Sequence, residues 1–160
     1  MTAAAPAQVV TFRLGDDLFA ADIASVERVL RHQAPRPVPK LPHWIVGVVD
    51  YRGRVVPVID LRERFELPHA DVTPATRILV FTVEGHWVAA VVDAVVEVTA
   101  LSGAELAPPP PLFRGLAAEY LCGIARRGER LIVYLNVARI LTATERLVLG
   151  EVADVVGAHG

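Results

Sequence analysis

An internal duplication constrains the fold of this 160-residue chain more than any single motif does. Residues 9–30 and 77–98 share one order of features: a strand pattern, a Gly-containing turn, a second strand pattern and spaced apolar residues. At a shift of 69 residues the matched pairs are Phe12 and Phe81, Leu14 and Val83, Leu18 and Trp87, Ile23 and Val92, Val26 and Val95, and Val29 and Val98. A repeat of about 70 residues exceeds the usual solenoid periods, so it predicts two similar halves.

The second part of each half predicts a hairpin that follows a proline-bearing segment. At a shift of 76 residues, Gly47 matches Gly123 and Asp60 matches Asn136. Both halves also carry an Arg-Gly turn one residue out of step, at 52–53 and 127–128. Short strands separated by turn residues are typical of small β-barrels. The sequence therefore predicts a mainly β fold in which two small barrels pack together.

The same pattern predicts how the chain is divided. Because residues 66–76 contain two prolines and several polar residues, they read as the connection between the halves. The helix pattern near the end begins at a Thr that can cap it. The predicted parts are a flexible start at 1–8, one domain at 9–150 with lobe one at about 9–75, lobe two at about 76–141 and a closing helix at about 142–149, and a flexible tail at 151–160.

Composition excludes several classes of partner. The net charge is −2 and the cations form no long basic run, so nucleic acid is not expected as the main partner. Hydrophobic residues make up 53% of the chain, enough for a core, yet no stretch is long and apolar enough to cross a membrane. The single cysteine, Cys122, allows no internal disulfide, and the first residues do not resemble a secretory signal. These features predict a cytoplasmic protein that does not insert into membranes.

The sequence offers no convincing active site. None of the five histidines forms a metal-binding pair, and no phosphate-binding or nucleophile motif is present, so neither a metal nor a cofactor is expected. An enzyme using Asp60, Asp93 or Cys122 remains an alternative. Asp60 more simply caps the helical turn that LRERF at 61–65 can form. We therefore expect no catalytic residue.

The hairpin GVVDYRGRVVPVIDLRERF, at 47–65, raises a question of function. Arg52 stands at its tip, where Gly53 supplies the positive φ of a tight turn. Tyr51 lies next to it, and Tyr and Arg are frequent anchors of protein interfaces. The tip is either a plain solvated turn or the contact surface of a binding module.

This hairpin resembles the signature hairpin of CheW-type coupling proteins of bacterial chemosensory arrays. Supporting features run from VVTFRLGDDLFAADI near the start to LIVYLNVARIL at 131–141, and include EYLCGIARRG at 119–128. The resemblance implies two five-stranded SH3-like barrels. It also implies a non-catalytic adaptor that links the cytoplasmic tip of a helical chemoreceptor to a CheA-type histidine kinase, whose regulatory domain shares the fold. Association with membrane-bound receptor arrays and self-association in array rings follow as further implications.

The resemblance also implies which residues make contacts. Receptor contacts fall on a groove between the barrels and on the hairpin, at Val26, Val29, Val48, Val49 and Arg52. Phe113, in the loop before EYL, occupies the region that in the family meets the kinase barrel.

Two departures from the family pattern predict altered partner choice. The family usually has Asn-Leu-Arg-Gly at the hairpin, whereas this chain has Asp50 and Tyr51 before Arg52. The family often has Glu two residues after the first valine of the VxxV segment, and here Arg28 takes that place while Glu27 comes one residue early. Charge reversal at a contact surface changes which partners fit. The hairpin variant is similar to adaptors of non-flagellar arrays, such as those for surface or biofilm signalling.

A second class of function shares the same fold prediction. A β-barrel module could bind a peptide or small ligand outside chemosensory signalling. Binding of such a ligand without affinity for a receptor tip would favour this alternative.

Overall fold

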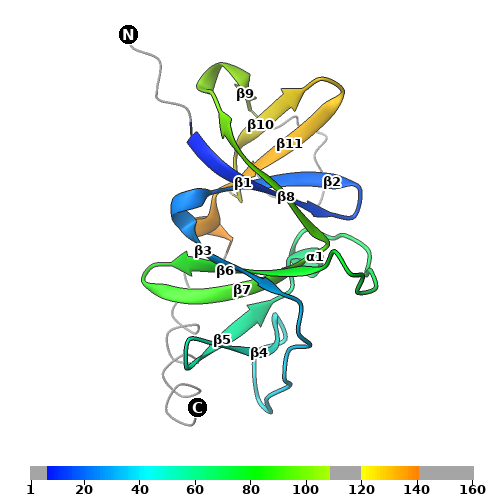
Figure 1. Cartoon of the computed structure of the whole chain (residues 1–160), viewed down its shortest axis with the longest axis vertical. Helices are drawn as coiled ribbons and strands as arrows, with labels where there is room; N and C mark the ends of the chain where they lie inside the picture. Colours follow the sequence, from blue (N-terminus) through cyan, green and yellow to red (C-terminus); the bar gives the residue numbers. More distant parts are fainter. Residues whose placement is uncertain (1–6, 109–119, 141–160) are drawn as a thin grey trace.

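The computed structural model describes residues 7–108 and 120–140, which form two β-sheets, one above the other in Figure 1. Sheet A contains, in spatial order, β8 (Ala94–Leu101), β1 (Ala7–Leu14), β2 (Asp17–Asp22), β11 (Arg130–Leu135), β10 (Leu121–Arg127) and β9 (Leu106–Ala107). Sheet B contains β3 (Val26–Arg31), β6 (Arg77–Val83), β7 (His86–Val92), β5 (Arg54–Ile59) and β4 (Ile45–Tyr51). The short helices are η1 (Ile23–Ser25), α1 (Leu61–Arg64), η2 (Gly103–Glu105) and η4 (Val137–Arg139). The predicted mainly β fold with two repeated units is confirmed.

Apart from the two-residue β9, which extends sheet A alone to six strands, the two sheets have the same strand order once repeat equivalents are substituted. β1, β2, β8, β11 and β10 of sheet A take the places of β6, β7, β3, β5 and β4 of sheet B. Each sheet also contains one parallel pair, β2 with β11 and β7 with β5, at equivalent positions. The duplication inferred from the sequence is therefore a duplication of the fold.

The sheets do not follow the predicted lobes at 9–75 and 76–141. Sheet A takes β1 and β2 from the first repeat and its other strands from the second. Sheet B takes β6 and β7 from the second repeat and its other strands from the first. After β2, the three-residue η1 leads the chain directly into the other sheet as β3. The third strands of the two repeats, β3 and β8, are thus exchanged between the sheets. The sequence could not indicate this exchange because β3 and β8 have similar patterns of apolar residues. The exchange binds the two units into one continuous structure.

Three apolar clusters hold this arrangement together. The largest contains residues from both sheets and from α1, among them the stacked rings of Phe12, Phe19 and Phe65. Smaller clusters lie within sheet B, around Val58, and within sheet A, around Ala125. Because the largest cluster joins the sheets, neither unit has a complete core of its own.

Local features agree with the turn chemistry expected from the sequence. Arg52 and Gly53 both have positive φ, at +49° and +74°, as a two-residue type I′ hairpin loop requires. The N–H of Glu63 donates to the Asp60 carboxylate at 3.1 Å, so the predicted cap of α1 is confirmed. A Cβ at Gly47 would lie 2.7 Å from the Arg36 carbonyl oxygen, so only glycine fits the bulge in β4.

Several predictions concern the ends of the chain. β1 begins at Ala7 and pairs with β8, so residues 7 and 8 belong to sheet A rather than to a flexible start. The predicted closing helix at 142–149, the tail at 151–160 and Phe113 lie outside the described residues. No helix within the described part of the chain is long and apolar enough to cross a membrane.

Candidate functional site

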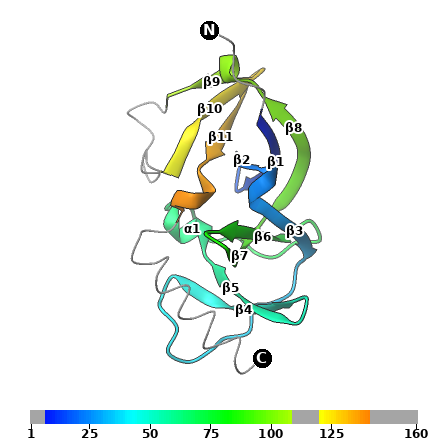
Figure 2. The same cartoon turned by 90° about the vertical axis from the view of Figure 1, so that its left-hand side faces the viewer.

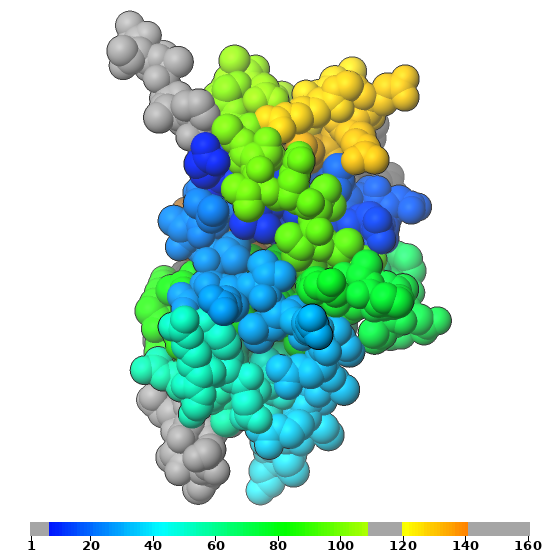
Figure 3. Space-filling view, viewed as in Figure 1, coloured from blue at the N-terminus to red at the C-terminus, as the bar shows by residue number. Residues whose placement is uncertain are grey.

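β3 and β8, the exchanged strands, lie on one face of the molecule. Each is the outermost strand at one end of its sheet's order. In Figure 1 both cross the front of the molecule, and in the turned view of Figure 2 both lie at its right-hand margin. Figure 3 shows their surfaces on either side of the boundary between the sheets. We call this region the β3–β8 face.

Exposed apolar side chains gather on the β3–β8 face. Seven large apolar residues of the described chain are exposed, and four of them lie on η1, β3 or β8: Ile23, Val29, Val96 and Val98. The side chain of Val98 is 57% exposed and that of its repeat equivalent Val29 is 40% exposed. Clustered exposed apolar side chains mark surfaces that contact other proteins. The predictions from the sequence included the valines of β3 but missed those of β8, although the 69-residue repeat pairs Val29 with Val98.

Two predicted contact residues, Val26 and Val29, belong to this face. In the register of sheet B, Val26 is opposite Phe81 and Val29 is opposite Leu79, and both partners are in the large central cluster. Val26 is partly buried and packs against that cluster, whereas Val29 is exposed. The central cluster therefore holds β3 in place through Val26, while Val29 stays exposed and is available for contact.

The β4–β5 hairpin tip is tied to β3 by one hydrogen bond. The hydroxyl of Tyr51 donates to the Glu27 carboxylate at 3.3 Å, and Glu27 directly follows Val26. Arg52 is exposed at the tip, next to the buried ring of Tyr51. The structure therefore brings the predicted residues Val26, Tyr51 and Arg52 into one region, and adds Glu27 to it.

Aromatic rings support the arginines of this tip. The rings of Tyr51 and Trp87 lie 4.9 Å apart between centroids. The Arg52 guanidinium lies over Tyr51 at 5.5 Å, and that of Arg54 lies over Trp87 at 5.0 Å. Such cation–π contacts restrict where a guanidinium can point. The sequence predictions missed Trp87 and Arg54, although Arg54 directly follows Gly53 and Trp87 stands two residues after Gly85.

Other predicted residues have different environments. The side chains of Val48 and Val49 are buried, at 2% and 1% exposure, so they support the hairpin from inside and offer no surface to a partner. Arg28 is exposed on β3. Asp50 is exposed and forms an ion pair with Arg36 at 2.9 Å.

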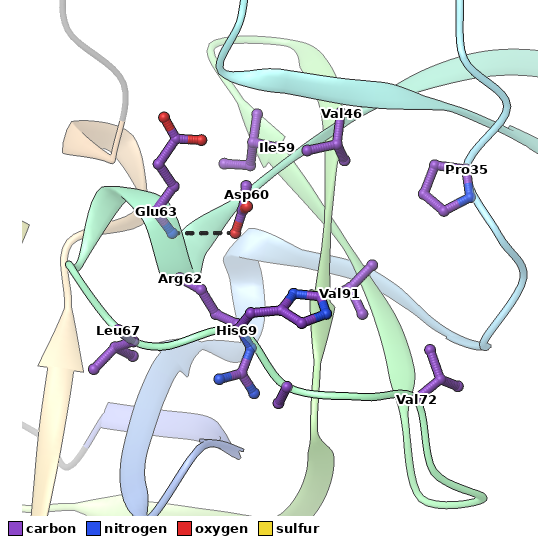
Figure 4. A pocket seen from close by; sticks show the side chains of 11 residues that line it. Pro35, Val46, Ile59, Asp60, Arg62, Glu63, Leu67, His69, Val72 and Val91 are labelled. Carbon is purple, nitrogen blue, oxygen red and sulfur yellow. Dashed lines mark hydrogen bonds between the residues drawn. The ribbon is translucent and has the colours of Figure 1, made fainter.

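A separate apolar pocket lies on sheet B. Its volume is about 520 Å³, and Figure 4 shows side chains converging on it from β4, β5, β7 and the segment after α1. Val46, Val72 and Val91 are among its apolar residues, and His69 and Arg62 add polar groups. This size lies in the range of small-ligand sites.

The candidate catalytic groups do not form one site. Asp60 caps α1, and Asp93 pairs with Arg62 and accepts the Gly15 N–H at 2.6 Å. Although burial opposes the change, these two contacts lower the pKa of Asp93. Partial burial of its sulfur raises the pKa of the Cys122 thiol. Each group serves a local contact, and no cluster of His, Cys, Asp and Glu suited to a metal occurs among the described residues.

Comparison with known proteins places this geometry in context. A family model described as CheW-like domain matches residues 8–145. The chain is 30% identical over 142 residues to Chemotaxis protein CheW of Treponema pallidum, covering 86% of this chain and 84% of that protein. It is 38% identical over 141 residues to Protein FrzA of Myxococcus xanthus, covering 86% and 87%.

A solved structure shows the same fold. The crystal structure of the scaffolding protein TtCheW from Thermoanaerobacter tengcongensis matches with a TM-score of 0.77 and 28% sequence identity. The match covers 88% of this chain and 90% of that chain. TtCheW therefore shares the overall fold of this chain over nearly the full length of both proteins.

Proposed function

Because this chain belongs to the CheW-like domain family, we propose that it is a non-catalytic scaffold of a bacterial chemosensory array. In this role it couples the cytoplasmic tips of chemoreceptors to a CheA-type histidine kinase. Relatives named as chemotaxis proteins, and a solved neighbour named as a scaffolding protein, support the proposal. The scaffold would then work in the cytoplasm beside membrane-bound receptors.

The observation that carries the proposal is the link between β3 and the hairpin tip. Val26 and Val29 supply apolar contacts on the β3–β8 face, and the Tyr51–Glu27 hydrogen bond ties the hairpin tip that carries Arg52 to β3. A helical hairpin presents apolar side chains along one side and polar ones at its margins, which suits such a surface. We assign the receptor contact to this region.

Contacts with the kinase follow from the shared fold. A regulatory domain built from similar units can pack against this chain unit to unit, and self-association in rings would use related contacts. The segment around Phe113 is the proposed kinase contact. The departures at Arg28, Asp50 and Tyr51 make a non-flagellar pathway the more specific form of the proposal.

Arg52→Glu tests the receptor contact. We expect it to weaken binding of a matching receptor cytoplasmic tip, measured by isothermal titration, without lowering the melting temperature, because the Arg52 side chain is exposed. A parallel titration with the regulatory domain of the kinase measures the second interaction that the proposed scaffold requires. Arg130→Glu, on the equivalent hairpin of sheet A, is the control and should bind as wild type. Equal weakening by both variants would contradict the assignment to this tip.

The pocket on sheet B carries the second candidate function, a module that binds a small ligand. A ligand screen by thermal shift, followed by Val91→Trp to fill the pocket, distinguishes the two candidates. A ligand whose stabilising effect disappears in that variant, together with no binding of receptor tips, would favour the second candidate.

A further inference from the structure

Two exposed arginines lie over the aromatic pair of sheet B, and a third follows Glu27, the residue that accepts the Tyr51 hydroxyl. Arg52 and Arg54 flank Gly53 in the β4–β5 turn, and each guanidinium lies over a ring. Arg28, on β3, directly follows Glu27 in the chain and is exposed. We call Arg28, Arg52 and Arg54 the arginine array.

The nearby carboxylates do not neutralise the array. Among the described residues, none of its three members forms an ion pair within 4.0 Å of a carboxylate. Glu27 is engaged by the Tyr51 hydroxyl, and Asp50 pairs with Arg36. The chain as a whole carries a net charge of −2, so this positive region stands out against the average of the molecule.

The equivalent end of sheet A shows that the array is not imposed by the fold. At a shift of 76 residues Arg127 takes the place of Tyr51, and its guanidinium donates hydrogen bonds to the Glu105 carboxylate and to the hydroxyl of Thr99. Arg130 takes the place of Arg54 but has no ring contact among the described residues. The aromatic support that holds outward-facing guanidiniums in place is therefore specific to sheet B.

We propose that the arginine array binds carboxylates on the partner segment that docks on β3, and that the Tyr51–Glu27 hydrogen bond is a positioning contact. The array selects a helical receptor hairpin with acidic side chains at the margin of its apolar side. Arginine pairs with a carboxylate through two parallel hydrogen bonds, so fixed guanidiniums select among otherwise similar hairpins. This inference rests on the proposed receptor-coupling function.

The positioning contact works by keeping Glu27 away from the array. With the Tyr51 hydroxyl present, the Glu27 carboxylate is held by a hydrogen bond to the β4–β5 hairpin. Without it, Glu27 is free to pair with Arg28 or Arg52 and to compete with the partner's carboxylates. Loss of the hydroxyl should therefore weaken binding only while Glu27 carries its charge.

The first experiment measures binding of recombinant receptor tip hairpins to Arg28→Glu and Arg54→Glu variants, with Arg130→Glu as the matched control. We expect each array variant to weaken binding about tenfold and the control to leave it unchanged. The wild-type affinity should fall as NaCl rises from about 50 to about 500 mM, since exposed charge pairs are screened by salt. A hairpin with one marginal Glu replaced by Lys should bind Arg54→Glu better than wild type does.

The outcomes separate the two claims. Hairpin binding that is unaffected by charge reversal and by salt would overturn the acidic-partner inference while the receptor-coupling function stands. No binding of any receptor hairpin would overturn both. Stronger binding of the wild type to phosphatidylglycerol vesicles than to any hairpin, lost in Arg54→Glu, would assign the array to a membrane surface and also overturn the inference.

The second experiment is a double-mutant cycle on the positioning contact. We expect Tyr51→Phe, which keeps the ring, to weaken hairpin binding severalfold, and Glu27→Gln to leave it equal or stronger. Tyr51→Phe should have no further effect when Glu27 is already Gln. Equal weakening by Tyr51→Phe in both backgrounds would show that the hydroxyl supports the fold and does not act through Glu27.

Discussion

The two hairpin ends of the molecule do the same structural task with different chemistry. In sheet B the Tyr51 hydroxyl reaches from β4 to Glu27 on β3. In sheet A the side chain at the equivalent position, Arg127, reaches from β10 toward β8, where it donates to Thr99 at 2.7 Å and to the carbonyl of Ala100. In both cases a side chain joins a hairpin to the exchanged strand at the opposite end of its sheet's order.

This comparison shows what the fold requires and what it leaves free. Each sheet has such a contact, made by a tyrosine hydroxyl in sheet B and by an arginine guanidinium in sheet A. The ionic version in sheet A neutralises its arginine in a partly exposed ion pair, between Arg127 and Glu105 at 3.0 Å. The aromatic version in sheet B leaves its arginines outside, where they can meet a partner. The fold is duplicated, but the surface chemistry has diverged.

The largest expected effect comes from a charge in the core that both units share. Val92 has no exposed surface, and its neighbours come from both sheets. Burying an unpaired carboxylate there costs on the order of 4 kcal/mol or more, against a typical stability of roughly 5–15 kcal/mol. We expect Val92→Asp to unfold sheets A and B together, because the cluster that contains Val92 joins the two sheets.

Circular dichroism with intrinsic fluorescence checks this prediction. Trp87 reports on sheet B, while far-ultraviolet ellipticity reports on both sheets. Val98→Asp, at an exposed position of β8, is the control and should melt like wild type. A Val92→Asp protein that loses the native Trp87 signal but keeps the ellipticity of sheet A would show that the units fold independently.

Sheet A should be the more sensitive of the two ends to loss of its closing contact. Arg127→Met removes the guanidinium but keeps an apolar stem, and leaves Glu105, Thr99 and the Ala100 carbonyl without their partner. We expect the melting temperature to fall by about 4–8 °C. Tyr51→Phe should lower it less, because the ring contact with Trp87 remains. Equal losses would show that the two contacts are energetically equivalent despite their chemistry.

Acid should distinguish the two ends further. Hydrogen bonds from Arg127 and from the Ser102 N–H lower the pKa of Glu105 from 4.5 to about 2. A group with a lowered pKa in the folded state contributes stability that is present above pH 4.5 and is lost as the pH falls toward 2. Melting curves across this range should show a larger acid-induced loss in wild type than in Arg127→Met. Parallel curves for the two proteins would contradict a stabilising role for the ionised Glu105.

The sequence predicted the repeat, the turns and the class of fold because each depends on local pattern. Paired apolar residues at a fixed shift, and Gly beside Arg52, required no knowledge of tertiary structure. The exchange of β3 and β8 was not predictable in this way, because either copy of the third strand could pair with β1 or with β6.

The site was predicted in part for the same reason. Val29 and Val49 are alike in sequence, yet one is exposed and the other is buried, and only the register of sheet B separates them. The Tyr51–Glu27 contact joins the two ends of a curled sheet, so neither residue signals the other in the chain. Trp87 reads as an ordinary apolar match to Leu18 until its ring is seen beneath Arg54.

The smallest expected effect concerns the two bulge positions. Val46 in β4 and Cys122 in β10 lie at equivalent places, just before Gly47 and Gly123, and both side chains are exposed. If the repeats differ here only by drift, Cys122→Val should change the melting temperature by less than about 2 °C and leave receptor-tip binding intact. Thermal melting and the same titration check this, with Cys122→Ser as a polar control. A loss of binding in both variants with unchanged stability would assign the thiol a functional role, because neither volume nor polarity would then account for the change.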